Sequence, residues 1–236
     1  MNTQPTPSSR NTWTARQEKP SPASPSPLGG FLDRHPMLFL TLAITLGLAG
    51  GLLSGIFIFK WNEWASPSFG LFTTPATLLG WTATKPKRAA EIGLTAMLAG
   101  VLGHFLGTQL TEYGQNNLEY RAWVGIALFL GPLLGYLGFT VRSRKALARA
   151  VATGIIIGLL CAPFYFATRL DISYFAEYTN LYTRLFDALS AALFFVLCRG
   201  VAARVLALVF SACLIWLSGP MMLVLSVILW RAGGGI

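Results

Sequence analysis

Charged residues are scarce in this sequence, and acidic residues are scarcer still. Asp, Glu, Lys and Arg together make up 11% of the 236 residues, and only nine residues are acidic. A water-soluble domain carries about 25% charged residues. Since 54% of the residues are hydrophobic, the composition excludes an ordinary soluble domain and predicts a single membrane domain.

Cysteine and histidine are also few. The three cysteines, Cys161, Cys198 and Cys213, lack the spacing of metal ligands, so we expect neither a disulfide framework nor a metal site. The only histidines are His35 and His104. The sequence has no phosphate-binding loop, no HExxH motif and no serine with a base at a plausible spacing. We therefore expect no catalytic residues, no cofactor and no enzymatic activity.

The longest uncharged run extends from Met37 to Phe59. It has about the 20 apolar residues that a helix needs to cross a bilayer. Gly47, Gly51 and Gly55 recur at every fourth position, which places them on one stripe of a helix. Such a stripe is typical of a surface where a second membrane helix approaches closely. A glycine-rich helix that faces lipid is the alternative interpretation.

Six further apolar stretches follow this run. We expect spans at residues 66–84, 89–109, 122–140, 148–168, 185–198 and 205–230. The second span is short and interrupted by Pro75, so a re-entrant segment is its alternative. The last contains Gly219-Pro220 and is predicted to be one kinked helix, because each half alone is too short to cross. The predicted fold is an all-α polytopic transmembrane bundle of about seven spans, with six as the alternative.

Three regions follow from this division of the chain. Residues 1–35 are rich in Pro and Ser, and we expect a disordered cytoplasmic tail, since such a segment buries too little apolar surface to fold. The transmembrane bundle occupies residues 36–231. Residues 232–236 form a short C-terminal tail.

Basic residues predict the orientation of the bundle. With the N-terminus in the cytoplasm and seven crossings, thirteen of the eighteen Lys and Arg residues fall on the inner side, as the positive-inside rule requires. Removing the second span would place the KPKR run at 85–88 outside. The formal net charge of +9 is therefore attributed to a membrane face, and we expect no nucleic-acid partner.

Small residues recur at helical spacing in three other spans. We assign them to helix packing, as on the first span. The additional predicted packing positions are Gly103, Gly107, Gly131, Gly135, Gly154 and Gly158.

A weak internal repeat links the first four spans. LAG-x-L occurs at 48–52 and again at 98–102, and Phe-x-x-Pro ends at Pro75 and at Pro132. A tandem duplication of a helix pair would produce this pattern, and parallel repeats occur in some transporters. Chance similarity between apolar helices is the alternative.

Few ionisable residues fall within predicted spans. Ionisable groups inside a membrane are costly and usually functional. His104 lies in the third span and Asp187 in the sixth, both in the predicted outer half of the bilayer. We predict that they approach each other as a proton-binding or polar-substrate site. The alternative is that His104 forms an interhelical hydrogen bond and Asp187 lies at the outer interface beside Arg184.

The fourth span, WVGIALFLGPLLGYLGFTVRS, contains a G-P-x-x-G-x-x-G core at Gly131, Pro132, Gly135 and Gly138. With the small-residue spans before it, this core resembles a family of small multi-spanning bacterial membrane proteins, mostly from actinobacteria, without an assigned biochemical function. The resemblance covers roughly residues 40–165. It implies a bacterial cytoplasmic membrane and a helix bundle, and it names no substrate.

Two classes of function fit these features. The first is a small transporter or the membrane subunit of one. If transport depends on ATP, a separate ATPase would dock on the basic inner loops. The second is a non-catalytic accessory or assembly protein that binds other membrane proteins through its glycine-rich helix faces. A polar vestibule near Pro75, His104 and Pro132 would favour transport, whereas a cavity closed to both sides and lined only by apolar residues would favour the accessory role.

Overall fold

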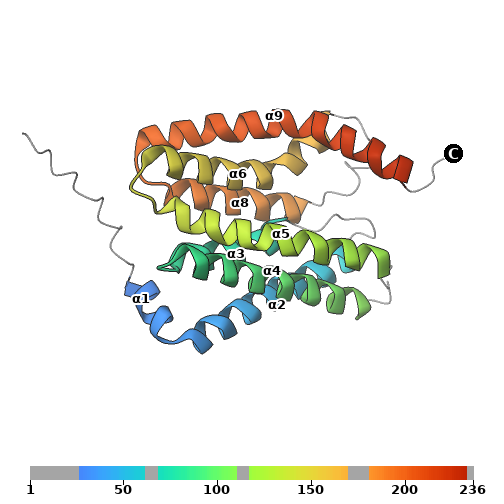
Figure 1. Ribbon diagram of the computed structural model, residues 1–236. Helices are drawn as coiled ribbons and strands as arrows, with labels where there is room; N and C mark the ends of the chain where they lie inside the picture. The colour runs from blue at the N-terminus through green and yellow to red at the C-terminus, as the bar shows by residue number, and fades with distance from the viewer. Residues whose placement is uncertain (1–26, 62–68, 111–116, 170–180, 233–236) are drawn as a thin grey trace, which may run out of the picture.

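The computed structural model describes residues 27–61, 69–110, 117–169 and 181–232, and every regular element in these ranges is an α-helix. The long helices lie side by side in one bundle (Figure 1). This confirms the predicted all-α class for the described residues. The helices are α1 (Pro27–Arg34), α2 (Pro36–Trp61), α3 (Phe69–Thr82), α4 (Pro86–Gln109), α5 (Asn117–Val141), α6 (Ala146–Arg169), α8 (Leu181–Leu197) and α9 (Val201–Ala232).

Within the described residues, three helices are long and apolar enough to cross a membrane. They are Pro36–Ile56 in α2, Pro86–Gln109 in α4 and Trp123–Val141 in α5. The described apolar parts of α6 and α9 are shorter. Helix α3 has 14 residues, or about 21 Å of helix, against a hydrocarbon core of about 30 Å. The architecture is that of a helical membrane protein, and the number of crossings remains a prediction.

Part of the predicted N-terminal tail is helical. Residues 27–34 form α1, and Leu32 is buried in the same apolar cluster as Phe39 of α2. The predicted disordered tail is therefore wrong over residues 27–34, because Leu32 provides an apolar anchor that the polar composition concealed. Residues 1–26 lie outside the described part of the chain.

The C-terminal span forms one helix, as predicted. Helix α9 continues through Gly219-Pro220 to Ala232. Of the predicted short tail at 232–236, only Ala232 lies within the described residues, and it belongs to α9.

Glycines bring the backbones of α2 and α4 together. A Cβ atom on Gly47, Gly51 or Gly55 would meet the carbonyl oxygen of Ala96, Gly100 or His104, respectively. The partners advance by four residues on each helix, so α2 and α4 run in the same direction. In return, Gly103 and Gly107 of α4 approach the backbone of α2 at Leu48 and Leu52. The glycine stripe on α2 thus lies against another helix.

The G-P-x-x-G-x-x-G core of α5 contacts two helices. Gly131 lies against α4 beside Leu94, and a Cβ on Gly135 would overlap the carbonyl oxygen of Ala89, also in α4. Gly138 faces α3, where a Cβ would overlap the carbonyl oxygen of Thr77. The spacing of the motif therefore sets how closely α5 approaches its two neighbours.

Helices α6 and α9 form a second parallel pair. A Cβ on Gly154 would lie 2.6 Å from Cβ of Phe210, and one on Gly158 would lie 2.6 Å from Cδ2 of Leu214. Both partners advance by four residues, as in the α2–α4 pair. Gly154 meets the backbone of α9 as well as a side chain, whereas Gly158 meets only the side chain of Leu214, so the contact is less close than that of Gly51 with Gly100.

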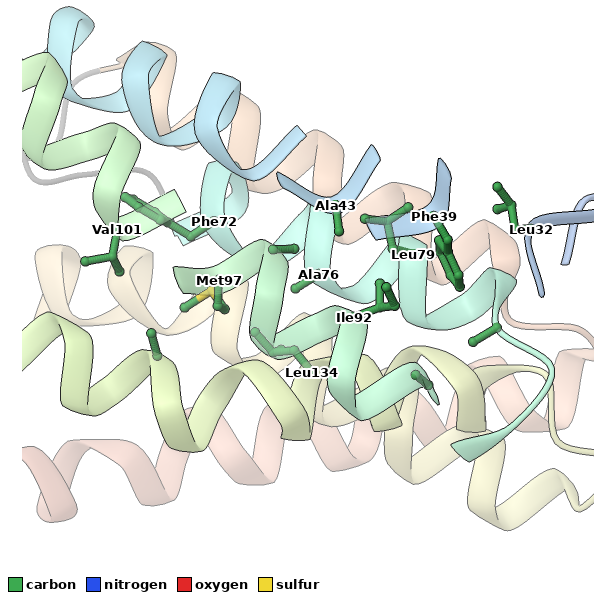
Figure 2. Close-up of a cluster of buried hydrophobic side chains, with 14 residues drawn as sticks. Leu32, Phe39, Ala43, Phe72, Ala76, Leu79, Ile92, Met97, Val101 and Leu134 are labelled. Carbon is green, nitrogen blue, oxygen red and sulfur yellow. The ribbon is translucent and has the colours of Figure 1, made fainter. Parts of the chain in front are cut away.

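An apolar cluster fills the space between α2, α3, α4 and α5. Figure 2 shows Phe39, Leu79 and Ile92 converging from three helices, with Leu134 of α5 below them. Phe39 and Leu134 are fully buried. The cluster holds α3 in the interior of the bundle, where it packs against α2, α4, α5, α6 and α8.

The two halves of the internal repeat lie next to each other, because α2 packs against α4 and α3 packs against α5. Their equivalent residues have different contacts. Gly50 and its counterpart Gly100 both face α3. Gly50 approaches a backbone atom, the carbonyl oxygen of Leu71, whereas Gly100 approaches a side chain, the ring of Phe72. A tandem duplication remains a prediction, and its two copies differ in packing.

We expect Gly51→Ala to destabilise the protein by about 1–3 kcal/mol, the usual cost of overpacking, because the added methyl group overlaps the carbonyl oxygen of Gly100. Gly125→Ala is the matched control, since a Cβ there meets no atom within 4 Å. Alanine favours helix by about 0.5–1 kcal/mol over glycine, so this control should be slightly stabilising. Thermal unfolding in detergent compares the two variants, and equal melting temperatures would contradict the assigned contact.

Candidate functional site at the ends of helix α3

Helix α3 is a short helix of the interior that carries several threonines. It contains Pro75, and the hydroxyl-bearing residues Thr73 and Thr77 are buried on it. Pro75 removes one backbone donor from the helix. A short helix in an apolar environment must satisfy the free amides of its first turn and the free carbonyls of its last turn. The residues that do so define the candidate site.

Asp187 of α8 satisfies the start of α3. The backbone N–H of Gly70 donates a hydrogen bond of 2.6 Å to Oδ1 of Asp187, whose exposed fraction is only 5%. A carboxylate at a helix N-terminus is favoured by the helix dipole. Gly70 permits this contact, because a Cβ there would lie 2.7 Å from the same oxygen and 2.9 Å from Oγ of Ser190.

His104 lies near the same end of α3. Its exposed fraction is 6%, and the centroid of its ring is 5.6 Å from that of Phe72, in an edge-on arrangement. Phe72 in turn stacks on Trp123 of α5, with 6.4 Å between centroids. The two predicted site residues thus contact α3 two positions apart, Asp187 at Gly70 and His104 at Phe72. Their joint role in proton or substrate binding remains a prediction.

Arg142, which follows α5, satisfies the other end of α3. Its Nη1 donates to the carbonyl oxygens of Trp81 at 2.8 Å and Ala83 at 3.2 Å. The guanidinium carbon also lies 5.9 Å from the centroid of the Trp81 ring. A cation at a helix C-terminus is favoured by the dipole. Burial, together with the charge of Arg199, lowers the pKa of Arg142 from its usual value.

Sequence reasoning assigned Arg142 only to a basic inner loop. The signal that could have singled it out was present, because the interval from Pro132 to Arg142 equals that from Pro75 to Lys85. The pattern could not show that Arg142 turns toward the end of another helix, since that contact joins residues about 60 positions apart.

Several hydroxyls of the interior bond to the backbone of their own helix. Thr77 donates to the carbonyl oxygen of Thr73 at 2.7 Å, and Thr82 donates to that of Leu79 at 2.8 Å. Three other hydroxyls are buried without a hydrogen-bond partner among the described residues, those of Ser54, Thr74 and Thr153. Most polar groups around α3 are therefore used by the fold itself.

The described residues contain no group of three or more His, Cys, Asp or Glu side chains able to hold a metal ion. Glu91 lies 3.7 Å from Arg88 and 4.0 Å from Lys87. These distances match a local ion pair at the start of α4. Because its side chain is half exposed, the pair is of the kind that contributes little to stability.

An apolar groove runs along the outward face of α5. It has a volume of about 500 Å³ and is lined by Gly125, Ile126, Phe129, Leu130 and Leu133. The exposed fraction of Phe129 is 84%. Gly125 opens the groove, since no atom lies within 4 Å of the position its Cβ would take.

The apolar spans, the glycine-packed helices and the charged residues at the ends of α3 together define a helical membrane protein. The chain belongs to a family of unknown function, DUF6518, which it matches over residues 32–227. This match extends beyond the 40–165 range of the resemblance noted from the sequence, and it includes α8 and most of α9. Neither the curated proteins nor the solved structures gave a match.

We expect Asp187→Ala to lower the stability of the protein by about 1.5–3 kcal/mol, the range for a hydrogen bond to a charged group, because it removes the acceptor for Gly70 N–H. Asp187→Asn retains a carbonyl acceptor and should cost less. Thermal unfolding in detergent measures both. Glu91→Gln, which removes a half-exposed carboxylate, is the control with little expected change. Equal losses for Asp187→Ala and Glu91→Gln would contradict the role of Asp187.

Arg142→Gln should also lower the melting temperature, because it removes the charge that binds the carbonyls at the end of α3. Arg142→Lys keeps the charge but has no planar fork to reach several carbonyls, and we expect an intermediate loss. Arg144→Gln removes an exposed charge from the same connection and serves as control. A melting temperature for Arg142→Gln equal to that of the control would show that this contact does not hold α3.

Proposed function

We propose that this protein is a non-catalytic membrane component that binds another membrane protein through the outward face of α5. The observation that supports this most directly is the apolar groove at Gly125, Phe129 and Leu133. Membrane helices associate through close contact at small residues. Gly125 is such a residue, and it faces outward rather than toward a neighbouring helix of this chain.

The interior supports this role over transport, which the sequence analysis placed first. Helices α2, α4 and α5 meet through glycines at backbone contact. On α3, the hydroxyls of Thr77 and Thr82 bond to the helix that carries them, and the carboxylate of Asp187 binds a backbone amide. A polar substrate needs groups that are available to bind it, and these are engaged.

Transport remains the second candidate, because of the buried hydroxyls of Ser54 and Thr74. These two groups lack a hydrogen-bond partner within the described residues, and buried polar groups usually have one. A small polar solute that passes along α3 would supply it. In that case a separate ATPase would be a partner.

We further propose a multi-pass arrangement in a bacterial cytoplasmic membrane, with the N-terminus in the cytoplasm. Its support is the location of the basic residues. Arg88 binds the carbonyl oxygen of Pro36, Arg142 binds the end of α3, and Arg149 lies beside Gly200. The connections α1–α2, α3–α4, α5–α6 and α8–α9 therefore gather at one end of the bundle (Figure 1), as a positive inner face requires.

Substitution of Gly125 tests the accessory role. Gly125→Leu fills the groove without a clash inside the protein, since a Cβ there meets nothing within 4 Å. We expect this variant to fold normally and to lose the membrane protein that co-purifies with the wild type in mild detergent. A photo-reactive residue at position 129 should crosslink to the same partner.

The matched control is Leu128→Phe, which enlarges an exposed residue of α5 that does not line the groove. This variant should retain the partner. Loss of the partner from both variants, or from neither, would contradict binding at the groove. Co-purification of an ATPase that persists in Gly125→Leu would favour transport.

A further inference from the structure

Among the basic residues at the end where four connections meet, two sets have different contacts. In the first set, each guanidinium donates to backbone carbonyls. Arg204 donates to the carbonyl oxygens of Cys198 at 2.8 Å and Val196 at 3.1 Å, where α8 ends. Arg149 donates to the carbonyl oxygen of Ser143 at 3.2 Å. Arg88 and Arg142 belong to the same set, which holds helix ends in place.

The second set is exposed to the surroundings. Arg144 and Lys145 in the α5–α6 connection and Arg199 in the α8–α9 connection have exposed side chains. No acidic residue in the described part of the chain forms an ion pair with any of the three. Their charges are therefore available to an external anion.

These two connections lie next to each other. Arg149 lies in the first turn of α6, and its guanidinium is 3.6 Å from the position that a Cβ on Gly200 would take. Nε of Arg149 is buried and has no hydrogen-bond partner among the described residues. Arg142 is close enough to Arg199 for the two like charges to oppose each other. Like charges held together without a counter-ion favour binding of an anion between them.

The helices that start at this point add to the positive potential. Helix α6 begins directly after Lys145 and α9 directly after Gly200, which has a φ of 91°. Neither helix has an acidic residue in its first turn. The positive ends of both helix dipoles are thus left without a carboxylate of their own.

Exposed apolar side chains lie next to the basic ones. The exposed fraction of Leu147 is 60%, two residues after Lys145, and that of Val201 is 76%, two residues after Arg199. A soluble anion or an acidic protein surface would bind the basic residues and leave these exposed apolar side chains without a contact. An anionic phospholipid has both required parts, a phosphate for the basic residues and acyl chains for the apolar ones.

We infer that the junction of the α5–α6 and α8–α9 connections binds an anionic phospholipid. Arg144, Lys145 and Arg199 contact the phosphate of the headgroup, and Leu147 and Val201 contact the first methylene groups of its acyl chains. This site is distinct from the α5 groove and does not depend on the function proposed for that groove.

The test is lipid binding to the full-length protein in detergent, counted by native mass spectrometry with phosphatidylglycerol and with phosphatidylcholine. The wild type should bind phosphatidylglycerol more tightly than phosphatidylcholine. The variant Arg144→Gln/Lys145→Gln/Arg199→Gln should lose this preference. Since one basic residue near an anionic lipid surface is worth roughly fivefold in affinity, removing three should reduce binding on the order of 100-fold.

The matched control is Arg34→Gln/Lys85→Gln/Lys87→Gln, which removes three exposed charges from the same end of the bundle at the other two connections. Charges beyond about 8 Å are screened at physiological salt, so this variant should lose less than about tenfold.

Three outcomes would overturn the inference. Equal losses in both triple variants would show diffuse attraction rather than a site. Equal affinity of the wild type for the two lipids would exclude selection of an anionic headgroup. Displacement of phosphatidylglycerol by excess inorganic phosphate would show that the acyl chains contribute nothing.

Discussion

The structure depends on the hydrogen bonds that charged side chains form with free backbone groups at the two ends of helix α3. At its start, a buried carboxylate from α8 accepts a hydrogen bond from Gly70. At its end, a guanidinium from beyond α5 donates to the carbonyls of Trp81 and Ala83. Each charge has the sign that complements the nearby end of the helix dipole. These contacts satisfy one backbone amide and two carbonyls at the ends of a helix of 14 residues, and unsatisfied polar backbone groups would be costly in an apolar interior.

The rest of the bundle is organised by contact between backbones. Apolar side chains gain little by leaving lipid for a protein interior, so close packing must supply the cohesion of a membrane bundle. Gly51 against Gly100 and Gly135 against Ala89 provide it in the half of the bundle that contains α2 to α5. Gly154 and Gly158 provide it between α6 and α9. Gly125 differs from these, because a Cβ there would meet no atom within 4 Å, and this makes α5 the candidate surface for a partner.

Several arginines likewise supply hydrogen bonds to backbone carbonyls at helix ends. Arg142 and Arg204 each bind carbonyls at the end of a helix that precedes them in sequence. The cytoplasmic face expected from the positive-inside rule thus carries two kinds of basic residue, those that close the bundle and those that remain exposed. Composition and topology rules count both kinds alike, although only the exposed ones can meet a ligand or a lipid.

The helices and most of their bounds could be predicted from the sequence, because each depends on a local run of apolar residues. The glycine spacing in α2 likewise indicated a packing surface, since a period of four is a property of one helix. The identity of the opposing helix was not predictable, because the contacts of Gly51 and Gly138 join segments about 50 to 60 residues apart. Composition was also an unreliable guide at α1. Its residues belong to a segment whose composition predicts disorder, but they form a helix whose Leu32 is buried in the apolar cluster.

For the candidate site, the sequence by itself selected His104 and Asp187, since ionisable residues in apolar runs are conspicuous. Only the tertiary structure decided what they touch. It placed the carboxylate of Asp187 at the first turn of α3 and the ring of His104 against Phe72, and it added Arg142 at the opposite end. The physical reason is that residue type and local spacing determine which segments become helices and which groups need a partner. The partner itself depends on which helices meet, and that is set by packing across the whole bundle.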